Sequence, residues 1–403
     1  MRATLFNASD CRNWFDATSI AALVIACWRW FNLGLLTGSL LPYGHRHGII
    51  CPNEWSSAYI MTSREQRAGI RHAGLDAYRL LMMLMIVWHH CCVHTEFGDG
   101  RGGIWLLMVL TLPCVDSFMG LSGYFGMRLS VRRVVRFLAL LVFYSFAFSS
   151  ICAITGRPPA GFHLGWYGVV YMAMLFLSPV LNAALESFAA SGRALRLLCL
   201  FVFLVLVQYV LNCVPGWGPY TVMNYVFVYM IVRCLVVGLP QQACSKAACG
   251  MLWACAIALS YVVAFALIRL GVITCESLSL VGRWTGYMSP VTILCAVLGL
   301  MFFSRLTMPL RIARVVSWLS PSVFSVYLIH DAYDLGRDLL VCLPVSWLRT
   351  NTALPAPVIV MSWGTCVLLS ALLVDVLLRR VPLAGLARII FCIRAVLYGR
   401  NEK

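Results

Sequence analysis

One predicted helix carries an arginine and a histidine at a spacing that places both on the same face. The run from Gly74 to Val93 is apolar and long enough to cross a bilayer, yet it contains Arg79 and His90. Eleven residues separate the pair, which is within about 20° of three full helical turns and a rise of roughly 16 Å. Since ionisable groups inside a membrane helix usually serve function, we expect this face to form a site rather than packing contacts alone.

His90 has the chemistry of a general base. A neutral imidazole, with an ordinary pKa near about 6.5, can take the proton of a hydroxyl group at neutral pH. His94 lies four residues further on, and the two could chelate a metal ion together. His89 points about 100° away on the same helix, and the sequence identifies no third ligand, so we expect no metal.

The composition identifies a polytopic membrane protein, so the elements that position this face are membrane helices. Of the 403 residues 61% are hydrophobic and 11% are charged, with a mean hydropathy of +0.85, which excludes a soluble globular domain. The 18 cysteines form no CxxC pair and lie mostly in apolar runs, so structural disulfides are not expected. Cys213 and Cys275, on predicted external loops, are the one pair that could form a bridge.

We predict an all-α fold, a polytopic transmembrane helix bundle with about ten core spans. The apolar runs lie at roughly 75–94, 103–127, 134–154, 166–185, 195–213, 220–239, 248–270, 284–303, 315–334 and 357–378. Residues 1–60 are predicted to be an N-terminal extension, which either adds one extra membrane helix at about 18–42 or stands outside the core. Residues 381–403 form a predicted basic tail.

Basic residues are distributed unevenly between the two sides of this bundle. Near the ends of the spans, nineteen Lys and Arg residues fall on one side and six on the other. By the positive-inside rule, both ends of the ten-helix core then lie in the cytoplasm, as in a multi-pass protein of the cell membrane. This distribution explains most of the net charge of +16, so no nucleic-acid partner is expected.

Further polar residues lie in and after the second span. Asp116 and Ser122 occur in CVDSFMGLSGYFG, where Gly123 is expected to permit close helix packing. Arg133 and Arg136 follow at the cytoplasmic end of the third span, three residues apart and therefore on one helix face. These two arginines are equally consistent with anchoring at anionic headgroups and with holding the phosphates of a cofactor.

Taken in order along the chain, these motifs resemble the membrane acyltransferase-3 family. They are R-x10-H at Arg79 and His90, VDSFMGLSGYF, RxxR at Arg133 and Arg136, WYGVVYMAMLFLSPVLN, YMSPVTILCAVLGLMFF and SVFSVYLIHD. Each motif is weak by itself, but the ordered set is specific and extends over about 75–380. The resemblance implies a membrane acyltransferase domain at 61–380, in a stand-alone form without a fused hydrolase-like domain.

The resemblance also implies an activity and roles for individual residues. Enzymes of this family move acyl groups, commonly acetyl and sometimes succinyl, from acyl-CoA to hydroxyls of surface polysaccharides or related molecules. By that resemblance His90 is the catalytic base, and Arg79 supports either the base or the donor. Arg133 and Arg136 would contact acyl-CoA. The motifs contain further candidate site residues: Asp116, Ser122, Trp166, Tyr167 and His330.

This sequence departs from the family pattern in three places. No Pro follows Arg136, which puts the local shape of the donor site in question. Ser117 and Gly120 interrupt the usual bulky apolar run, and HLGWY at 163–167 carries one extra Gly. These last two departures are expected to be tolerated.

Other functions and other mechanisms stay open. Cys91, Cys92 or Ser122 could form a covalent acyl-enzyme, although direct transfer is favoured. The runner-up function is a transporter or flippase of a small polar solute or lipid-linked sugar. Ionisable residues inside the predicted spans that could serve it are Asp116, Arg233, His330 and Asp375.

The acceptor has no readable pattern in the sequence. We expect a glycan or lipid-linked sugar to meet the external loops at 155–165, 213–220, 271–283 and 335–356. Aromatic residues there could stack on sugar rings, although interfacial anchoring explains most of them as well.

Overall fold

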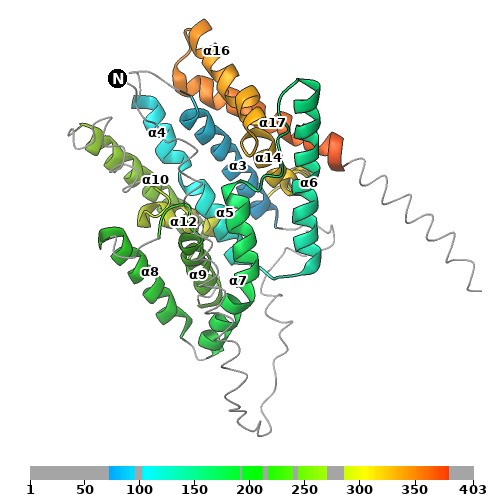
Figure 1. The fold of residues 1–403 in the computed structure, drawn as a ribbon. Helices are drawn as coiled ribbons and strands as arrows, with labels where there is room; N and C mark the ends of the chain where they lie inside the picture. Colours follow the sequence, from blue (N-terminus) through cyan, green and yellow to red (C-terminus); the bar gives the residue numbers. More distant parts are fainter. Residues whose placement is uncertain are drawn as a thin grey trace, which may run out of the picture. The chain divides into compact units, whose positions relative to one another are not determined.

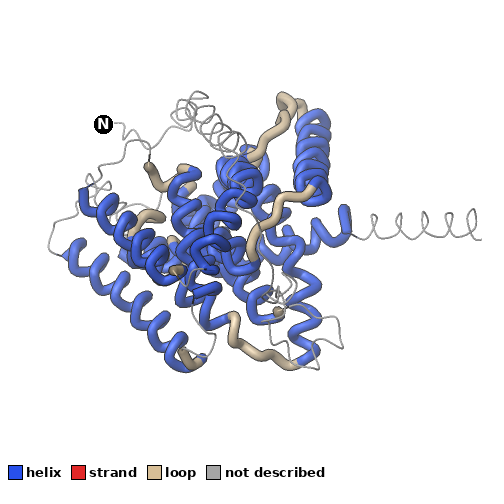
Figure 2. The backbone as a smooth tube through the Cα atoms, turned by 90° about the horizontal axis from the view of Figure 1, so that it is seen from below, coloured by secondary structure: helices blue, strands red, loops and turns tan. Residues whose placement is uncertain are grey.

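The computed structural model describes residues 72–95, 102–190, 193–211, 217–238, 244–269 and 286–380. Within these ranges the regular structure is helical and no strand occurs, as Figure 2 shows. The all-α class is confirmed for this part of the chain. The predictions for residues 1–60 and 381–403, and for the Cys213 and Cys275 pair, fall outside the described residues.

The helices follow one another in the order of the predicted apolar runs. The first are α3 (Ala73–Val93), α4 (Gly102–Thr111), α5 (Pro113–Phe125), α6 (Val131–Ile154) and α7 (Gly165–Ala190). Next come α8 (Ala194–Leu211), α9 (Val222–Gly238), α10 (Lys246–Arg269) and α12 (Pro290–Phe303). The last part holds α13 (Leu310–Leu319), η4 (Ser320–Ser322), α14 (Val323–His330), α15 (Asp334–Arg337), η5 (Asp338–Cys342), α16 (Leu343–Asn351), α17 (Ala356–Asp375) and η6 (Val376–Arg380).

Seven described helices are long and apolar enough to cross a membrane. They are Leu106–Phe125, Val131–Ile154, Gly165–Phe188, Ala194–Leu211, Lys246–Ala266, Leu310–His330 and Ala356–Arg380. Of the other predicted spans, α3 has 21 residues but carries charged and imidazole groups, while α9 and α12 are apolar with 17 and 14 residues. The predicted count of about ten spans is therefore not confirmed.

One predicted span is interrupted and one predicted loop needs correction. The span predicted at 103–127 corresponds to the apolar run Leu106–Phe125, in which a turn at Leu112 separates α4 from α5 because Pro113 has no backbone N–H to continue the helical hydrogen bonds. The external loop predicted at 335–356 contains α15, η5 and α16. Their apolar runs are too short to span a bilayer, so a search for apolar stretches of about 20 residues passes over them.

Helix α3 lies in the interior of the bundle. It packs against α4, α5, α12, α13, α14 and α17 (Figure 1). Its Tyr78 and Val87 are fully buried, which fits a central helix. Close packing elsewhere depends on small residues: a Cβ atom on Gly123 of α5 would lie 2.6 Å from the Tyr229 carbonyl oxygen of α9, so the expected close contact at Gly123 is confirmed.

Candidate active site

Two histidines from distant parts of the chain meet where α3 contacts α14. The Nδ1 atom of His90 lies 2.9 Å from the Nε2 atom of His330, and the ring centroids are 5.0 Å apart. His90 occupies the last turn of α3, and His330 is the final residue of α14. The packing of these two helices therefore brings together two of the residues that the sequence motifs single out.

The two imidazoles differ in burial. His330 is 0% exposed, and its Nδ1 atom lies 2.6 Å from the carbonyl oxygen of Val326, one turn earlier in α14. The side chain of His90 is 16% exposed. Of the pair, only His90 can be reached by a molecule that enters the site.

Asp331 adds a carboxylate beside the histidines. Its Oδ1 atom lies 2.9 Å from Nε2 of His94 and 3.6 Å from Nδ1 of His90. Burial by itself raises the pKa of Asp331, but the neighbouring histidines, with His90 foremost, lower that pKa below its ordinary value. A carboxylate oxygen can only accept a hydrogen bond, so with Asp331 ionised His94 Nε2 donates to it.

The same groups form a set that could hold a cation. One ligand atom each from His90, His94 and Asp331 lies within 4.8 Å of the others. Two imidazoles and a carboxylate suit a transition metal. The sequence does not identify this third group, because Asp331 comes from a segment more than 200 positions away from His94. The expectation of no metal stays a prediction.

Arg79 lies toward the other end of α3, with its own partners. Its Nη1 atom donates to Oδ1 of Asp76 at 2.9 Å, and the same oxygen accepts a hydrogen bond from Ser320 at 2.8 Å. The guanidinium lies 5.1 Å from the centroid of the Phe125 ring. Since the helix rises roughly 16 Å between Arg79 and His90, Arg79 does not touch the histidines.

The two predicted donor-binding arginines stand in the first turns of α6. The Ser130 side chain caps this helix by accepting a hydrogen bond from the backbone N–H of Arg133 at 3.3 Å. The side chains of Arg133 and Arg136 are both exposed.

Asp116 stands apart as a buried carboxylate without partners. It is 0% exposed, and neither oxygen has a hydrogen-bond partner among the described residues. Leaving a charged group in this state is costly.

An aromatic cluster surrounds the start of α7 and reaches toward the histidines. Trp166 packs against the rings of Tyr167, Tyr220, Tyr225 and Tyr287, at centroid distances of 5.7, 5.0, 6.1 and 6.4 Å. Asp116 of α5 is two residues before Phe118, whose ring centroid lies 6.4 Å from that of Tyr167. A Cβ atom on Gly165, next to Trp166, would collide with the Tyr327 hydroxyl, and the Tyr327 ring centroid lies 6.4 Å from that of His330, so the start of α7 lies beside the histidine site.

The three candidate nucleophiles are not paired with the base. The Ser122 hydroxyl donates to the Phe118 carbonyl oxygen at 3.2 Å, within its own helix. Cys91 and Cys92 are buried, with 0% and 5% exposure. None of the three forms a hydrogen bond with His90 among the described residues, so direct transfer remains favoured over an acyl-enzyme.

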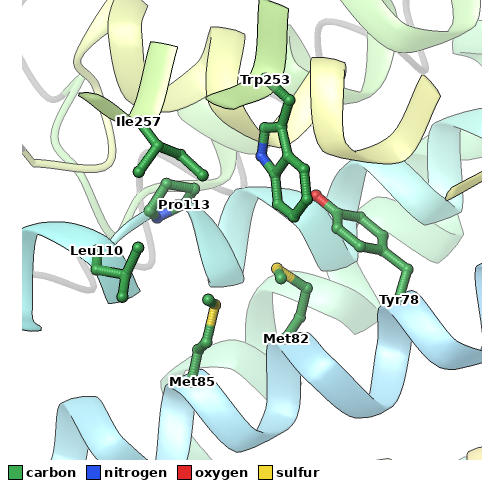
Figure 3. A pocket seen from close by; sticks show the side chains of 7 residues that line it. All are labelled: Tyr78, Met82, Met85, Leu110, Pro113, Trp253 and Ile257. Atoms are coloured by element: carbon green, nitrogen blue, oxygen red, sulfur yellow. The ribbon is translucent and has the colours of Figure 1, made fainter. Parts of the chain in front are cut away.

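A small apolar pocket lies on another face of α3. Figure 3 shows Tyr78, Met82 and Met85 of α3 lining it. Its other lining residues are Leu110, Pro113, Trp253 and Ile257. Its volume of about 10 Å³ is close to what one water molecule needs, so it cannot hold a nucleotide-sized donor.

Sequence reasoning missed Asp331 and gave His94 no role other than that of a rejected metal ligand. Asp331 directly follows His330 in SVFSVYLIHD, and a carboxylate at the end of an apolar run could have been recognised there. The contact of Asp331 with His94 could not have been recognised from the sequence, because it depends on α3 and α14 packing side by side.

Comparison with known proteins supports the resemblance found in the motifs. A family model described as an acyltransferase domain, that of the acyltransferase-3 family, matches residues 72–380, which is more than half of the chain. No curated protein and no solved structure matches the chain.

Proposed function

Because the chain belongs to the acyltransferase-3 family, we propose that it moves an acyl group from cytosolic acyl-CoA to a hydroxyl of a surface glycan or lipid-linked sugar. The family and the apolar helices make it a membrane acyltransferase. Acetyl is the proposed acyl group, and succinyl is the alternative. The observation that carries the proposal is the partly exposed His90, held at 2.9 Å by the buried His330.

His90 is the general base in this proposal. It takes the proton of the acceptor hydroxyl while the hydroxyl oxygen bonds to the thioester carbonyl carbon. The carbon–sulfur bond then breaks, and the CoA sulfur leaves with the proton that His90 received. Each atom and proton is accounted for without a metal or a covalent enzyme intermediate.

Arg133 and Arg136 are the proposed contacts for the donor. Both are exposed at the start of α6, where a molecule from the aqueous phase can reach them. A guanidinium offers two parallel donors to a phosphate, and CoA carries several phosphate groups. Arg79 lies roughly 16 Å along α3 from His90, so we assign Arg79 to the donor side rather than to the base.

The aromatic cluster at Trp166 is the proposed contact for the acceptor. Its rings offer flat apolar surfaces, and the unpaired carboxylate of Asp116 can accept hydrogen bonds from hydroxyl groups. The packing of Tyr327 between the start of α7 and His330, with a ring-centroid distance of 6.4 Å to His330, supports this assignment.

The transport interpretation loses support, because three of the four ionisable residues it needs have hydrogen-bond partners, and only Asp116 has none among the described residues. Arg379 donates two hydrogen bonds to the two carboxylate oxygens of Asp375, at 2.6 and 2.7 Å. His330 is bonded to His90, and Arg233 lies 3.5 Å from the Tyr124 carbonyl oxygen. Structural pairing explains these groups without an ion pathway.

The test is chemical analysis of surface glycans in cells with and without the gene. We expect acyl esters to be lost from one glycan in the cells without it, and to return with the wild-type gene but not with His90→Ala. Unchanged glycan acylation in the cells without the gene would contradict the proposal. The cytoplasmic placement of both ends of the core is tested separately, by reporter fusions at residues near 72 and 380.

A further inference from the structure

The histidine site contains a chain of hydrogen-bonding groups that ends on a backbone carbonyl. The Val326 oxygen lies 2.6 Å from Nδ1 of His330, and Nε2 of the same ring lies 2.9 Å from Nδ1 of His90. A carbonyl oxygen can only accept, so His330 must carry its proton on Nδ1. This fixes one end of the chain.

The protonation of the second ring follows from the first. His330 is 0% exposed, and a charged ring in that position would need compensation. A neutral ring with its proton on Nδ1 has a lone pair on Nε2, so Nε2 of His330 accepts. His90 must then donate from its own Nδ1, which leaves the lone pair of His90 on Nε2.

Asp331 favours the same arrangement. Its carboxylate lies 3.6 Å from Nδ1 of His90, on the side that carries the proton. A negative charge there favours a proton on Nδ1, and it also stabilises the imidazolium that forms when Nε2 takes a second proton. His94 donates to the same carboxylate oxygen at 2.9 Å and so helps to hold it in place.

We propose that His330 is a positioning residue, which fixes His90 in the form whose Nε2 atom is the base. Asp331 stabilises the charged ring during the reaction, and no proton passes to His330. In the transfer step the acceptor hydroxyl proton goes to Nε2 of His90, and from there to the CoA sulfur when the thioester bond breaks. The inference rests on the proposed function, in which His90 is the base.

The two amide substitutions at position 330 separate this role from a structural one. In His330→Gln the longer side chain can place its amide oxygen near the former Nε2 position and accept from His90. In His330→Asn the shorter amide can still donate toward Val326, but it does not reach His90. We expect His330→Gln to retain most of the turnover and His330→Asn to lower kcat by about 10- to 100-fold, the scale of losing a partner that orients a functional histidine.

The assay uses purified full-length protein in lipid nanodiscs, with acetyl-CoA as donor and envelope glycan extracted from cells without the gene as acceptor. Release of the CoA thiol gives kcat and KM. The KM for acetyl-CoA should stay within about twofold in both variants, because neither touches the donor arginines. Equal kcat values for His330→Gln and His330→Asn, at equal protein yield, would overturn the positioning role.

A double variant tests whether His330 acts through His90. If it does, adding His330→Asn to His90→Ala should cause no further loss, because the orientation of an absent ring cannot matter. A further 10-fold or larger loss would overturn the inference.

A tightly bound stoichiometric metal that disappears in His94→Ala would overturn it too, since His90 Nδ1 would then be a ligand instead of a donor. If His90→Ala itself keeps full turnover, the proposed function fails. If His90→Ala is inactive while His330→Asn is fully active, only the positioning role fails.

Discussion

The Nε2 atom of His94 lies 2.9 Å from the Oδ1 atom of Asp331. This pair distinguishes a hydrogen-bonded base from a metal site, because in a metal site His94 would be as essential as His90. We expect His94→Ala to lower kcat by no more than about tenfold, the order of one lost hydrogen bond. The measurement is turnover of purified protein together with elemental analysis, and tightly bound zinc in the wild type would contradict the expectation.

His90→Ala should abolish most of the activity while the protein stays abundant. Alanine has high helix propensity and removes a polar group from an apolar environment, so insertion should not suffer. Acyl transfer should fall by a factor on the order of 10² to 10⁴, the usual scale for a lost general base.

The control for this prediction is His89→Ala, one position away on the same helix. His89 faces a different side, where its Nδ1 atom lies 3.0 Å from the hydroxyl of Thr111. We expect at least half of the activity to remain in this variant, measured as glycan acylation per unit of membrane protein. Comparable losses for both variants would point to a structural role of the helix end.

Replacing Arg133 and Arg136 together with Lys should raise the KM for acyl-CoA by roughly tenfold or more and leave the KM for the acceptor unchanged. A single ammonium cannot reproduce the two parallel donors that a guanidinium offers to a phosphate. The matched control is the double change of Arg193 and Arg196 to Lys, because these arginines are also exposed and three residues apart but lie at the start of another helix, α8 (Ala194–Leu211). A change in the KM for the acceptor alone would contradict the assignment of these arginines to the donor.

The sequence predicts the helical class, the central helix and the motif residues, because each depends on local composition and spacing. Arg79 and His90 on one face of α3 follow from the 3.6-residue period alone. The partners of His90 do not follow in this way, since His330 is 240 positions later and its contact requires α14 to pack against α3. The predicted span count is not confirmed, in part because polar residues reduce the hydropathy of α3, although its neighbours bury it.

Asp116→Asn should separate acceptor recognition from folding. The substitution keeps the shape and exchanges one unpaired buried polar group for another, so thermal stability should be about equal. If Asp116 contacts the acceptor, the KM for the glycan should rise by about tenfold, as expected for one lost hydrogen bond. If the KM for the glycan is unchanged in a stable Asp116→Asn variant, Asp116 does not contact the acceptor.

The extra glycine of HLGWY gives the last prediction. Gly165 has φ 62°, and a Cβ atom there would lie 2.3 Å from the Tyr327 hydroxyl oxygen. Tyr327 is adjacent to the histidine site, with its ring centroid 6.4 Å from that of His330. Gly165→Ala therefore combines an unfavourable backbone conformation with a steric conflict that displaces a neighbour of His330.

Gly161→Ala is the matched control, because Gly161 has φ 67° but nothing within 4 Å of the added methyl group. Both variants bear the backbone cost of about 1–2 kcal/mol. Only Gly165→Ala should add an overpacking cost of about 1–3 kcal/mol and lose acyl transfer. Thermal unfolding midpoints in nanodiscs and turnover per folded protein provide the comparison. Equal midpoints and equal turnover for the two variants would show that Tyr327 does not pack against Gly165 as the structure describes.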